Sequence, residues 1–457
     1  MMVFQPRRAA LAVVLACAGL CGSTMAHAGG DKSPAAMLGV EELARLAVSR
    51  APAIQVRARE VDAAEYGVSA ARWGRFPSLS LSGASHAWQS SAAPSGTQPG
   101  SVVKLEQTLY AWGGIEGRIQ AAEQQRDIAA LARLAEINVV LDRLITAFGQ
   151  FQQAQERITL QRLALARLRD YQAMIARRRA TQLSSANDEA LVLSRVFQTE
   201  ADIATTESSL QRARALIEEL TFEQVQSVRP GETTLPDVGS LAELEGQALR
   251  VSPELASARL QREVADTEVS LKKADMMPRL IGRVQGVRSP TASQTLSYTQ
   301  AYIGVEASLT NGLSQFDGVR QSVSRMQAAE QQIQVQERNV RQLCLSTWAD
   351  ANNYSVQIPA LAGLVQNNGS VVESFMRQYI AGKKSWLDVL NAERELTQSQ
   401  LSQADVRAQI AMAGLRLRRL TGQLLSDDAG VAVGTAPGAE PLAAVSESRS
   451  TNQDPVQ

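Results

Sequence analysis

The alternation of apolar and polar positions along the chain changes period twice in each of two halves. Apolar residues spaced by three and four, as in a coiled-coil seam, occur at Leu134, Ile137, Leu141, Leu144, Phe148 and Phe151. A helix from about Gly114 to Ala180 would be ~100 Å long. Similar spacing occurs later, at Val319, Met326, Ile333, Val340 and Leu343 and again at Leu401, Ala404, Ala408, Ala411 and Leu415. The pattern predicts long helices packed side by side.

Short segments with a period of two lie between the predicted helices. Val103 and Leu105 alternate with polar neighbours, and Ile303 and Val305 do the same in the second half. Each segment is preceded by a partner, at 78–89 and 279–289, so each half contains a strand hairpin. Four residues mark the expected transitions between helix and strand, the prolines because they remove a helical hydrogen bond: Pro77, Pro278, Gly113 and Gly312.

The two halves are an internal repeat at an interval of about 200 residues. Residues 43–79 align with 244–280 without a gap, and Asp188 corresponds to Asp388. The fold class is therefore mainly α with a small β part, duplicated in tandem. We divide the chain into a leader at 1–28, a first repeat at 38–228, a linker at 229–240, a second repeat at 241–424 and a disordered C-terminal tail at 425–457.

Four predicted strands of about ten residues have the length that crosses an outer membrane when tilted. Four strands cannot close, and open sheet edges are not tolerated in hydrocarbon. Two copies of the chain would give eight strands around a filled lumen, and three copies would give twelve around a pore. The polar residues Lys104, Glu106, Arg283 and Glu306 favour the wider barrel, with these side chains in its lumen. A soluble hairpin packed on helices is the alternative.

The first 28 residues have the pattern of a signal peptide. Arg7 and Arg8 precede an apolar run, and Ala26-His27-Ala28 fits a small-x-small cleavage site. A lipidated Cys17 is the less favoured alternative, because Cys17 lies inside the apolar run. Removing the leader takes two of the 46 basic residues, two of the three cysteines and one of the two histidines.

The remaining composition excludes several classes of function. Cys344 and His86 are too few for a disulfide framework, a Cys/His metal site or a Ser-His or Cys-His hydrolase. No pair of carboxylates is placed as a general acid and base, so we expect no enzymatic activity and no cofactor. Cys344 stands in a helical apolar pattern and is predicted to be a buried, inert thiol. The balanced charge does not indicate a nucleic-acid partner, and no segment after the leader reaches the roughly 18 apolar residues of a transmembrane helix.

Three motifs occur in a fixed order at 76–81, 105–113 and 381–393. With the duplication and its spacing, they resemble the TolC-like outer-membrane efflux proteins over about residues 38–424. The resemblance implies a homotrimer with a twelve-stranded barrel in the outer membrane of a Gram-negative bacterium. It also implies that a helical coiled-coil tunnel continues the barrel through the periplasm.

The resemblance further implies where the periplasmic entrance lies. The helix reversals near 180–187 and 380–387 would form the tip, where Asp388 matches an aspartate that forms an acidic ring. Asn391 stands where the family has a second aspartate, so the acidic constriction should be weaker. Tyr379 and Lys384 match residues that hold the closed entrance, and Asp188 is their candidate partner. Ordinary polar residues at a coiled-coil tip are the alternative, since Lys384 replaces an arginine and the two are not equivalent donors.

The basic run Arg177-Arg178-Arg179 precedes the first of these reversals. A solvated helix face is the simpler interpretation of such a run. The functional alternative is contact with a periplasmic adaptor protein.

The leading hypothesis for function is a passive exit duct of a tripartite exporter. Energy would come from an inner-membrane ABC or proton-driven transporter, reached through the adaptor. The hypothesis leans to type I protein secretion, because the expected mature chain lacks a lipidated cysteine at its start. The outer component of a small-molecule, multidrug or metal efflux pump is the alternative. A periplasmic coiled-coil adaptor or scaffold without a pore is an alternative of another class.

Overall fold

A computed structural model of the chain describes residues 38–84, 100–225, 229, 240–290, 295–307 and 314–424. The predicted leader, the tail, most of the linker and Gly312 lie outside these residues. The described part contains the following elements: α1 (Val40–Arg50), α2 (Pro52–Trp73), β1 (Ser78–Ala84), β2 (Gly100–Tyr110), α3 (Gly114–Ala180), α4 (Ala186–Thr221), α5 (Leu241–Val251), α6 (Pro253–Asp275), β3 (Arg279–Pro290), β4 (Thr295–Glu306), α7 (Ser314–Ile380) and α8 (Trp386–Leu420).

The same order of two helices, two strands and two helices occurs twice in the described chain. Proline occupies the first position of α2 and of α6, where the missing N–H has no helical partner to lose. Pro77 and Pro278 each directly precede a strand. Gly113 lies before α3 with φ +81, a left-handed conformation that glycine adopts without strain. Local sequence signals therefore set the element boundaries in both halves.

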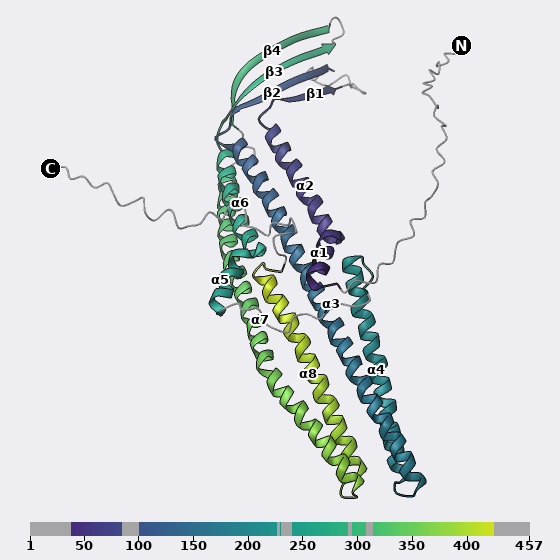
Figure 1. The fold of residues 1–457 in the computed structure, drawn as a ribbon. Helices are drawn as coiled ribbons and strands as arrows, with labels where there is room; N and C mark the ends of the chain where they lie inside the picture. The colour runs from purple at the N-terminus through teal and green to yellow at the C-terminus, as the bar shows by residue number, and fades with distance from the viewer. Residues whose placement is uncertain are drawn as a thin grey trace, which may run out of the picture. The chain divides into compact units, whose positions relative to one another are not determined.

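The four strands form one antiparallel sheet in the order β1-β2-β3-β4 (Figure 1). Glu106 pairs with Arg283 across β2 and β3, and Arg283 pairs with Tyr302 across β3 and β4. The register shifts between Thr108 and Tyr110, at the end of β2 next to the helices. Within the described residues, the outer edges of β1 and β4 pair with no other strand.

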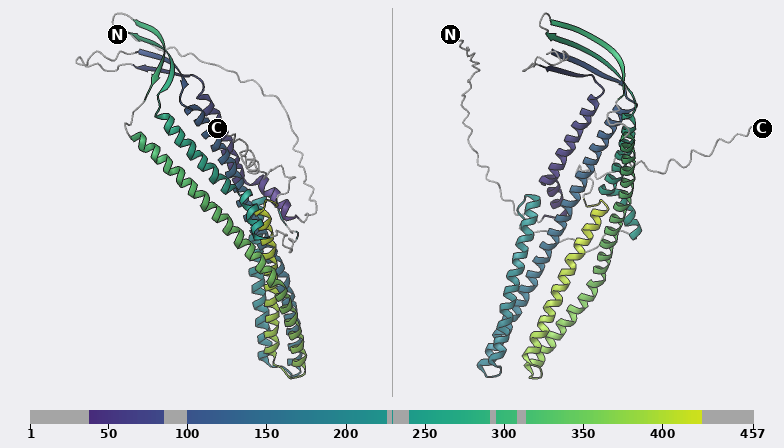
Figure 2. Two further views of the ribbon diagram at one scale, coloured as in Figure 1. Left: turned by 90° about the vertical axis from the view of Figure 1, so that its left-hand side faces the viewer. Right: turned by 180° about the vertical axis from the view of Figure 1, so that it is seen from behind.

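The helices extend from one end of the sheet and form two antiparallel hairpins, α3/α4 and α7/α8 (Figures 1 and 2). The predicted seam of α3 is buried from Ile137 to Phe151 in the largest apolar cluster, with Leu134 partly buried against it, and the cluster also contains Met412 and Leu415 of α8. The later seam is buried along α8 as predicted, at Leu401, Ala404, Ala408, Ala411 and Leu415. None of the described helices is long and apolar enough to cross a membrane.

The seam predicted for α7 is wrong in part. Leu343 is 43% exposed, whereas the neighbouring Cys344 is fully buried, as predicted for this thiol. Val340, Cys344 and Ala351 of α7 pack with residues of α5 and α8, and Thr347 between them is buried as well. Val340 is thus buried as predicted, and the buried face continues through Cys344 and not through Leu343. Burial raises the pKa of the Cys344 thiol, which keeps it protonated and unreactive.

Candidate channel lining and entrance

The charged residues predicted to line a lumen lie together on one face of the sheet. The Glu106 carboxylate lies 2.5 Å from Lys104 Nζ and 2.7 Å from Arg283 Nη2. Arg283 Nη2 also lies 3.9 Å from Glu306, and its Nη1 donates to the Tyr302 hydroxyl at 2.6 Å. Two positive and two negative side chains therefore form one network across β2, β3 and β4. Such a network is suited to contact with water and not with hydrocarbon.

The opposite face of the same sheet is apolar and exposed. Its members alternate with the charged network along each strand: Leu79, Leu81, Val103, Leu105, Val284, Ile303 and Val305. Val305 is 72% exposed on this apolar face, whereas its neighbour Glu306 points to the charged face and forms an ion pair with Arg279. An exposed apolar face of this size indicates that a partner or lipid covers it.

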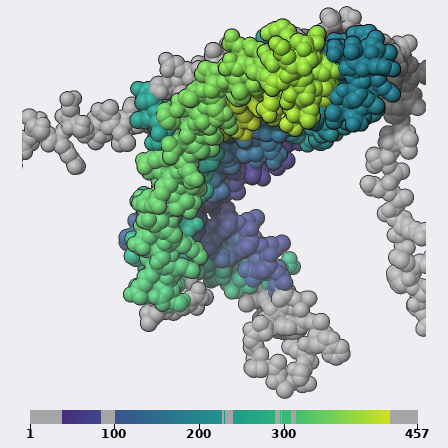
Figure 3. Space-filling view, turned by 90° about the horizontal axis from the view of Figure 1, so that it is seen from below, coloured from purple at the N-terminus to yellow at the C-terminus, as the bar shows by residue number. Residues whose placement is uncertain are grey.

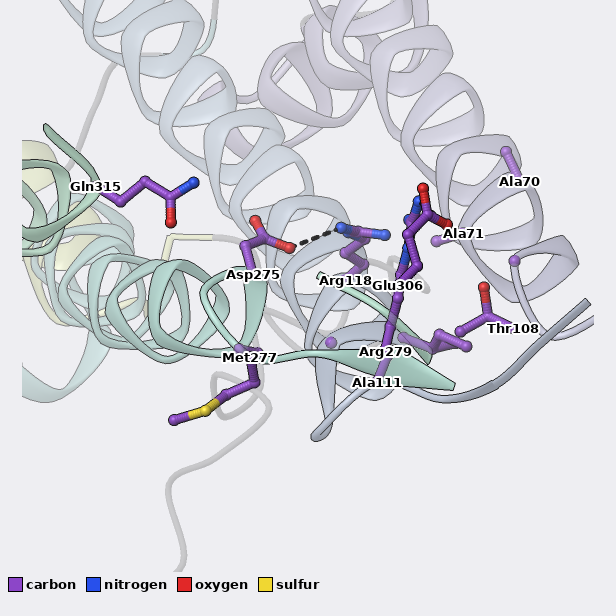
Figure 4. A pocket seen from close by; sticks show the side chains of 14 residues that line it. Ala70, Ala71, Thr108, Ala111, Arg118, Asp275, Met277, Arg279, Glu306 and Gln315 are labelled. Atoms are coloured by element: carbon purple, nitrogen blue, oxygen red, sulfur yellow. Dashed lines mark hydrogen bonds and ion pairs between the residues drawn. The ribbon is translucent and has the colours of Figure 1, made fainter. Parts of the chain in front are cut away.

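A cavity of about 570 Å³ lies where the sheet meets the helices. Ala70 and Ala71 of α2, Ile115 of α3 and Ala274 of α6 contribute its apolar wall. Two ion pairs, at 3.0 and 3.1 Å, stand at its polar side (Figure 4), namely Arg118 with Asp275 and Arg279 with Glu306. The charged face of the sheet thus continues into the space between the helices. No sequence motif indicated Arg118, Asp275 or Arg279, although Asp275 and Arg279 flank the transition at Pro278 and Arg118 follows the transition at Gly113.

Asp388 lies in the first turn of α8 and forms a capping box with Ser385. Its carboxylate accepts hydrogen bonds from the Ser385 hydroxyl at 2.8 Å and the Ser385 N–H at 3.1 Å. These bonds hold the pKa of Asp388 below its usual value. Asp188 forms the same box with Ser185 at the start of α4. Asn391 follows Asp388 by one turn and is half-buried.

Tyr379 joins the two hairpins at their turns, which lie side by side (Figure 3). Its hydroxyl lies 3.0 Å from the Ser184 hydroxyl in the α3/α4 turn. The Arg178 guanidinium lies over its ring, 5.0 Å from the centroid. Within the single chain, the Tyr379 hydroxyl therefore contacts Ser184, and the contact with Asp188 stays a prediction. Within the single chain, Lys384 lies over the Phe375 ring of its own hairpin, 4.5 Å from the centroid.

The basic run before the first turn is divided among different environments. Arg178 stacks on Tyr379, Arg179 forms an ion pair with Glu189, and Arg177 is exposed. At least two of the three arginines therefore hold the turn of their own chain. A uniformly solvated face does not describe this run.

Sequence reasoning missed two buried residues near the tip, Trp386 and Glu393. Trp386 packs against Tyr379 and Tyr171, with ring centroids 5.1 and 5.7 Å apart. Glu393 is a carboxylate among the buried positions Leu390, Ala392 and Leu396 of α8. A charged residue at an apolar position of the helical pattern was the signal that could have identified it.

Within the described residues, no group of three or more His, Cys, Asp or Glu side chains is placed to hold a metal ion. The candidate site has three parts: the sheet with one charged and one apolar face, the polar cavity where the sheet meets the helices, and the two helical turns.

The profile of the family described as outer membrane efflux protein matches residues 43–221 and 244–423. The chain is similar to the outer membrane efflux protein BepC of Brucella suis biovar 1, with 23% identity over 251 residues, 52% of this chain and 55% of BepC. It is also similar to the alkaline protease secretion protein AprF of Pseudomonas aeruginosa, with 27% identity over 183 residues, 39% of this chain and 38% of AprF. The matched segments therefore span about half or less of these curated relatives.

Solved structures share the fold over a larger part of the chain. The structure of CusC, whose description refers to transmembrane channel formation, has a TM-score of 0.74 and 16% identity, and the match covers 84% of this chain and 91% of CusC. The fold of mainly long helices with a small antiparallel sheet is thus that of a known group of proteins.

Proposed function

The chain belongs to the outer membrane efflux protein family, and from that membership we propose that three copies form a passive channel through the outer membrane. Each copy contributes its four strands to a shared twelve-stranded barrel. The helical hairpins continue the barrel as a tunnel into the periplasm. The channel performs no chemistry of its own.

The observation that carries this proposal is the two-faced sheet with open edges. The apolar face, with Ile303 and Val305, suits lipid, and the charged face, with Glu106 and Arg283, suits a water-filled lumen. Unpaired edges at β1 and β4 are tolerated in hydrocarbon only when another strand pairs with them. Copies related by rotation would join β4 of one to β1 of the next. Three copies leave a lumen wide enough for passage.

The turn end of the hairpins is proposed as the periplasmic entrance. Asp388 would form an acidic ring there, with Asn391 behind it, and Tyr379 would hold the entrance closed through Ser184. A periplasmic adaptor would bind near these turns and connect the channel to an inner-membrane transporter. The energy for export would come from that transporter.

For the cargo we propose proteins exported by type I secretion, supported by the likeness to the alkaline protease secretion protein AprF. The likeness to BepC, described as an efflux protein, favours small molecules as the second candidate. Expression in cells that lack their own outer-membrane channel distinguishes the two. Restored protease in the medium together with unchanged dye sensitivity supports protein cargo, and the reverse result overturns it.

The channel itself is tested with purified protein. Mass measurement in detergent should return three copies, and planar bilayers should show stepwise conductance. A stable monomer or dimer, or the absence of conductance in planar bilayers at high protein concentration, would overturn the proposal.

A further inference from the structure

Arg419, near the end of α8, is a cation that the fold encloses without satisfying it. Its side chain is 13% exposed, and its Nε is buried without a hydrogen-bond partner among the described residues. Its Nη2 lies 3.6 Å from Asp142 Oδ1, which is too long for a hydrogen bond. Arg416 Nε lies at the same distance from the same oxygen. Because buried charges in proteins are normally paired and hydrogen-bonded, Arg419 calls for a further acceptor.

The acidic residues around Arg419 are already engaged. Burial lowers the pKa of Arg419, and the carboxylates of Asp142 and Glu254 raise it. Glu254 accepts a hydrogen bond from the Ser252 hydroxyl at 2.9 Å, and Asp142 is shared with Arg416. An arginine keeps its proton in proteins, so loss of the charge cannot relieve the cost of burial.

Two neighbouring cavities give room for an acceptor. Their volumes are about 40 and 250 Å³, and Arg419 lines both of them. Val251 of α5, Pro253 of α6 and Asn138 of α3 also belong to both walls. A carboxylate on a short side chain fits such a space, because its oxygens accept from the guanidinium while its carbon atoms meet the apolar wall.

The chain itself continues from the wall of the smaller cavity. Leu424, the last residue that the structure describes, lines this cavity together with Arg419. It is 3% exposed and belongs to the largest apolar cluster, so the start of the following segment is fixed there. That segment begins Leu425-Ser426-Asp427-Asp428. At ~3.5 Å per residue, Asp427 is within about 11 Å of Leu424, which brings its carboxylate within reach of the guanidinium.

The end of the first repeat shows a related arrangement with the opposite charge. At an interval of 200 residues, the pair Arg418-Arg419 corresponds to Glu218-Glu219 at the end of α4. Glu218 accepts a hydrogen bond at 3.2 Å from the N–H of Val225, in the segment that follows α4. Val225 is 1% exposed, so this segment folds back onto the helix that it leaves. In the second repeat, basic side chains replace the glutamates, and the segment that follows carries Asp427-Asp428. The two are complementary in charge.

We propose that the cavities beside Arg419 form a carboxylate site whose occupant is the acidic pair Asp427-Asp428 of the same chain. The pair fastens the segment after α8 against α3, α5 and α6, as Glu218 fastens the segment after α4. The predicted disordered tail then begins after Asp428. Since every residue of the site belongs to one chain, the site does not depend on the proposed channel function.

The test uses the full-length protein in detergent and variants that remove charge at little change in size. Asp427→Asn combined with Asp428→Asn removes the charge of the occupant. Glu440→Gln combined with Glu447→Gln is the matched control, because it removes two acidic charges from the same segment farther along the chain.

Hydrogen exchange is measured in peptides that cover 412–424 of α8 and 246–256 of α5 and α6, together with the melting temperature. The variant at Asp427 and Asp428 should exchange about tenfold faster in both peptides and melt about 2–4 °C lower, because a buried charge loses its partner. The control at Glu440 and Glu447 should behave as the parent protein does.

Arg419→Met shows whether the two aspartates act through this guanidinium. In the Arg419→Met background, the changes at Asp427 and Asp428 should alter neither exchange nor melting temperature, because their partner is gone. In an Arg418→Met background, the same changes should keep their full effect. Equal effects in both backgrounds would show that the aspartates act elsewhere and would overturn the site.

Truncation after Leu424 distinguishes the segment from a free carboxylate. The truncated protein should exchange as fast as the variant at Asp427 and Asp428. Sodium acetate should restore part of its protection, whereas sodium chloride at the same ionic strength should not. Acetate should have no effect on the full-length protein or on truncated Arg419→Met. Protection of the full-length protein by acetate would show that free carboxylates occupy the site, and would overturn the segment as its occupant.

An unchanged exchange rate and melting temperature in the variant at Asp427 and Asp428 would overturn the proposal and leave the cavities to water. If Arg419→Met does not fold, the comparison of the two acidic variants and the acetate measurements decide. None of these experiments requires conductance. Failure of the channel in planar bilayers would therefore leave the carboxylate site standing, and the two proposals fail by different results.

Discussion

Asp388 is subject to two opposing electrostatic influences. Within one chain, hydrogen bonds from Ser385 lower its pKa. In a three-fold ring, two further carboxylates would raise it. The capping bonds favour the charged form, so their contribution is present above the ordinary pKa of about 3.9 and is lost as the pH falls through the folded value. The ring should therefore stay charged at neutral pH.

Asp388→Asn should reduce the cation selectivity of the channel and weaken its block by divalent or trivalent cations. Selectivity of the parent should stay constant from about pH 8 to pH 5 and fall only at lower pH. Asp188→Asn is the matched control, because Asp188 makes the same capping box in the other hairpin. Reversal potentials in planar bilayers provide the measurement. Equal effects of both variants would show that capping, and not a charged ring, explains Asp388.

In strand β4, successive residues face two different environments. Val305 and Glu306 are neighbours, yet Val305 lies opposite Leu280 on the apolar face and Glu306 lies 3.1 Å from Arg279 on the charged face. A shift of one residue in pairing would exchange these environments for every residue of the strand. The register is thus the property of the strand that matters for membrane insertion.

Val305→Arg should impair membrane assembly at a cost of about 2–4 kcal/mol if the residue lies near the bilayer midplane. Glu306→Gln should leave assembly intact and alter conductance modestly. Heat-stable oligomer in outer-membrane fractions measures the first effect, and bilayer recordings measure the second. Interchanged outcomes would place the lipid on the opposite face of the sheet.

For the whole molecule, the single chain leaves apolar surfaces exposed that further copies would cover. Besides the sheet edges, α7 exposes an apolar series at helical spacing: Val335, Leu343, Val356, Leu364 and Val371. Val356 is the most exposed of these five side chains, at 66%. Lateral packing of hairpins from neighbouring copies would cover this series.

Val356→Glu should therefore weaken assembly, because a carboxylate would be buried between helices without a partner. Light scattering in detergent should show a shift from three copies toward one. Gln357→Glu is a control that adds the same charge to the adjacent, partly exposed position of α7. A variant that remains fully trimeric would place the interface elsewhere.

The local pattern of the chain determined the elements and their repetition. Periodicity predicted α3 from Gly114 to Ala180, as observed, because a helix of this length repeats its signal many times. The alternation at Val305 and Glu306 likewise placed the two residues on opposite faces, since facing follows directly from the strand period. Asp188 and Asp388 were recognised as equivalent because both follow the same turn in a duplicated sequence.

Only the tertiary structure decided which residues meet between the hairpins. Within the chain, Tyr379 contacts Ser184, and Glu393 meets Arg167 although the two are far apart in sequence. Beside the exposed Leu343, the buried position of α7 is Cys344, which packs with residues of α5 and α8. Periodicity specifies the face of a helix, but the partner across that face depends on how helices approach one another. Contacts between distant segments therefore have no signature in the sequence of either segment alone.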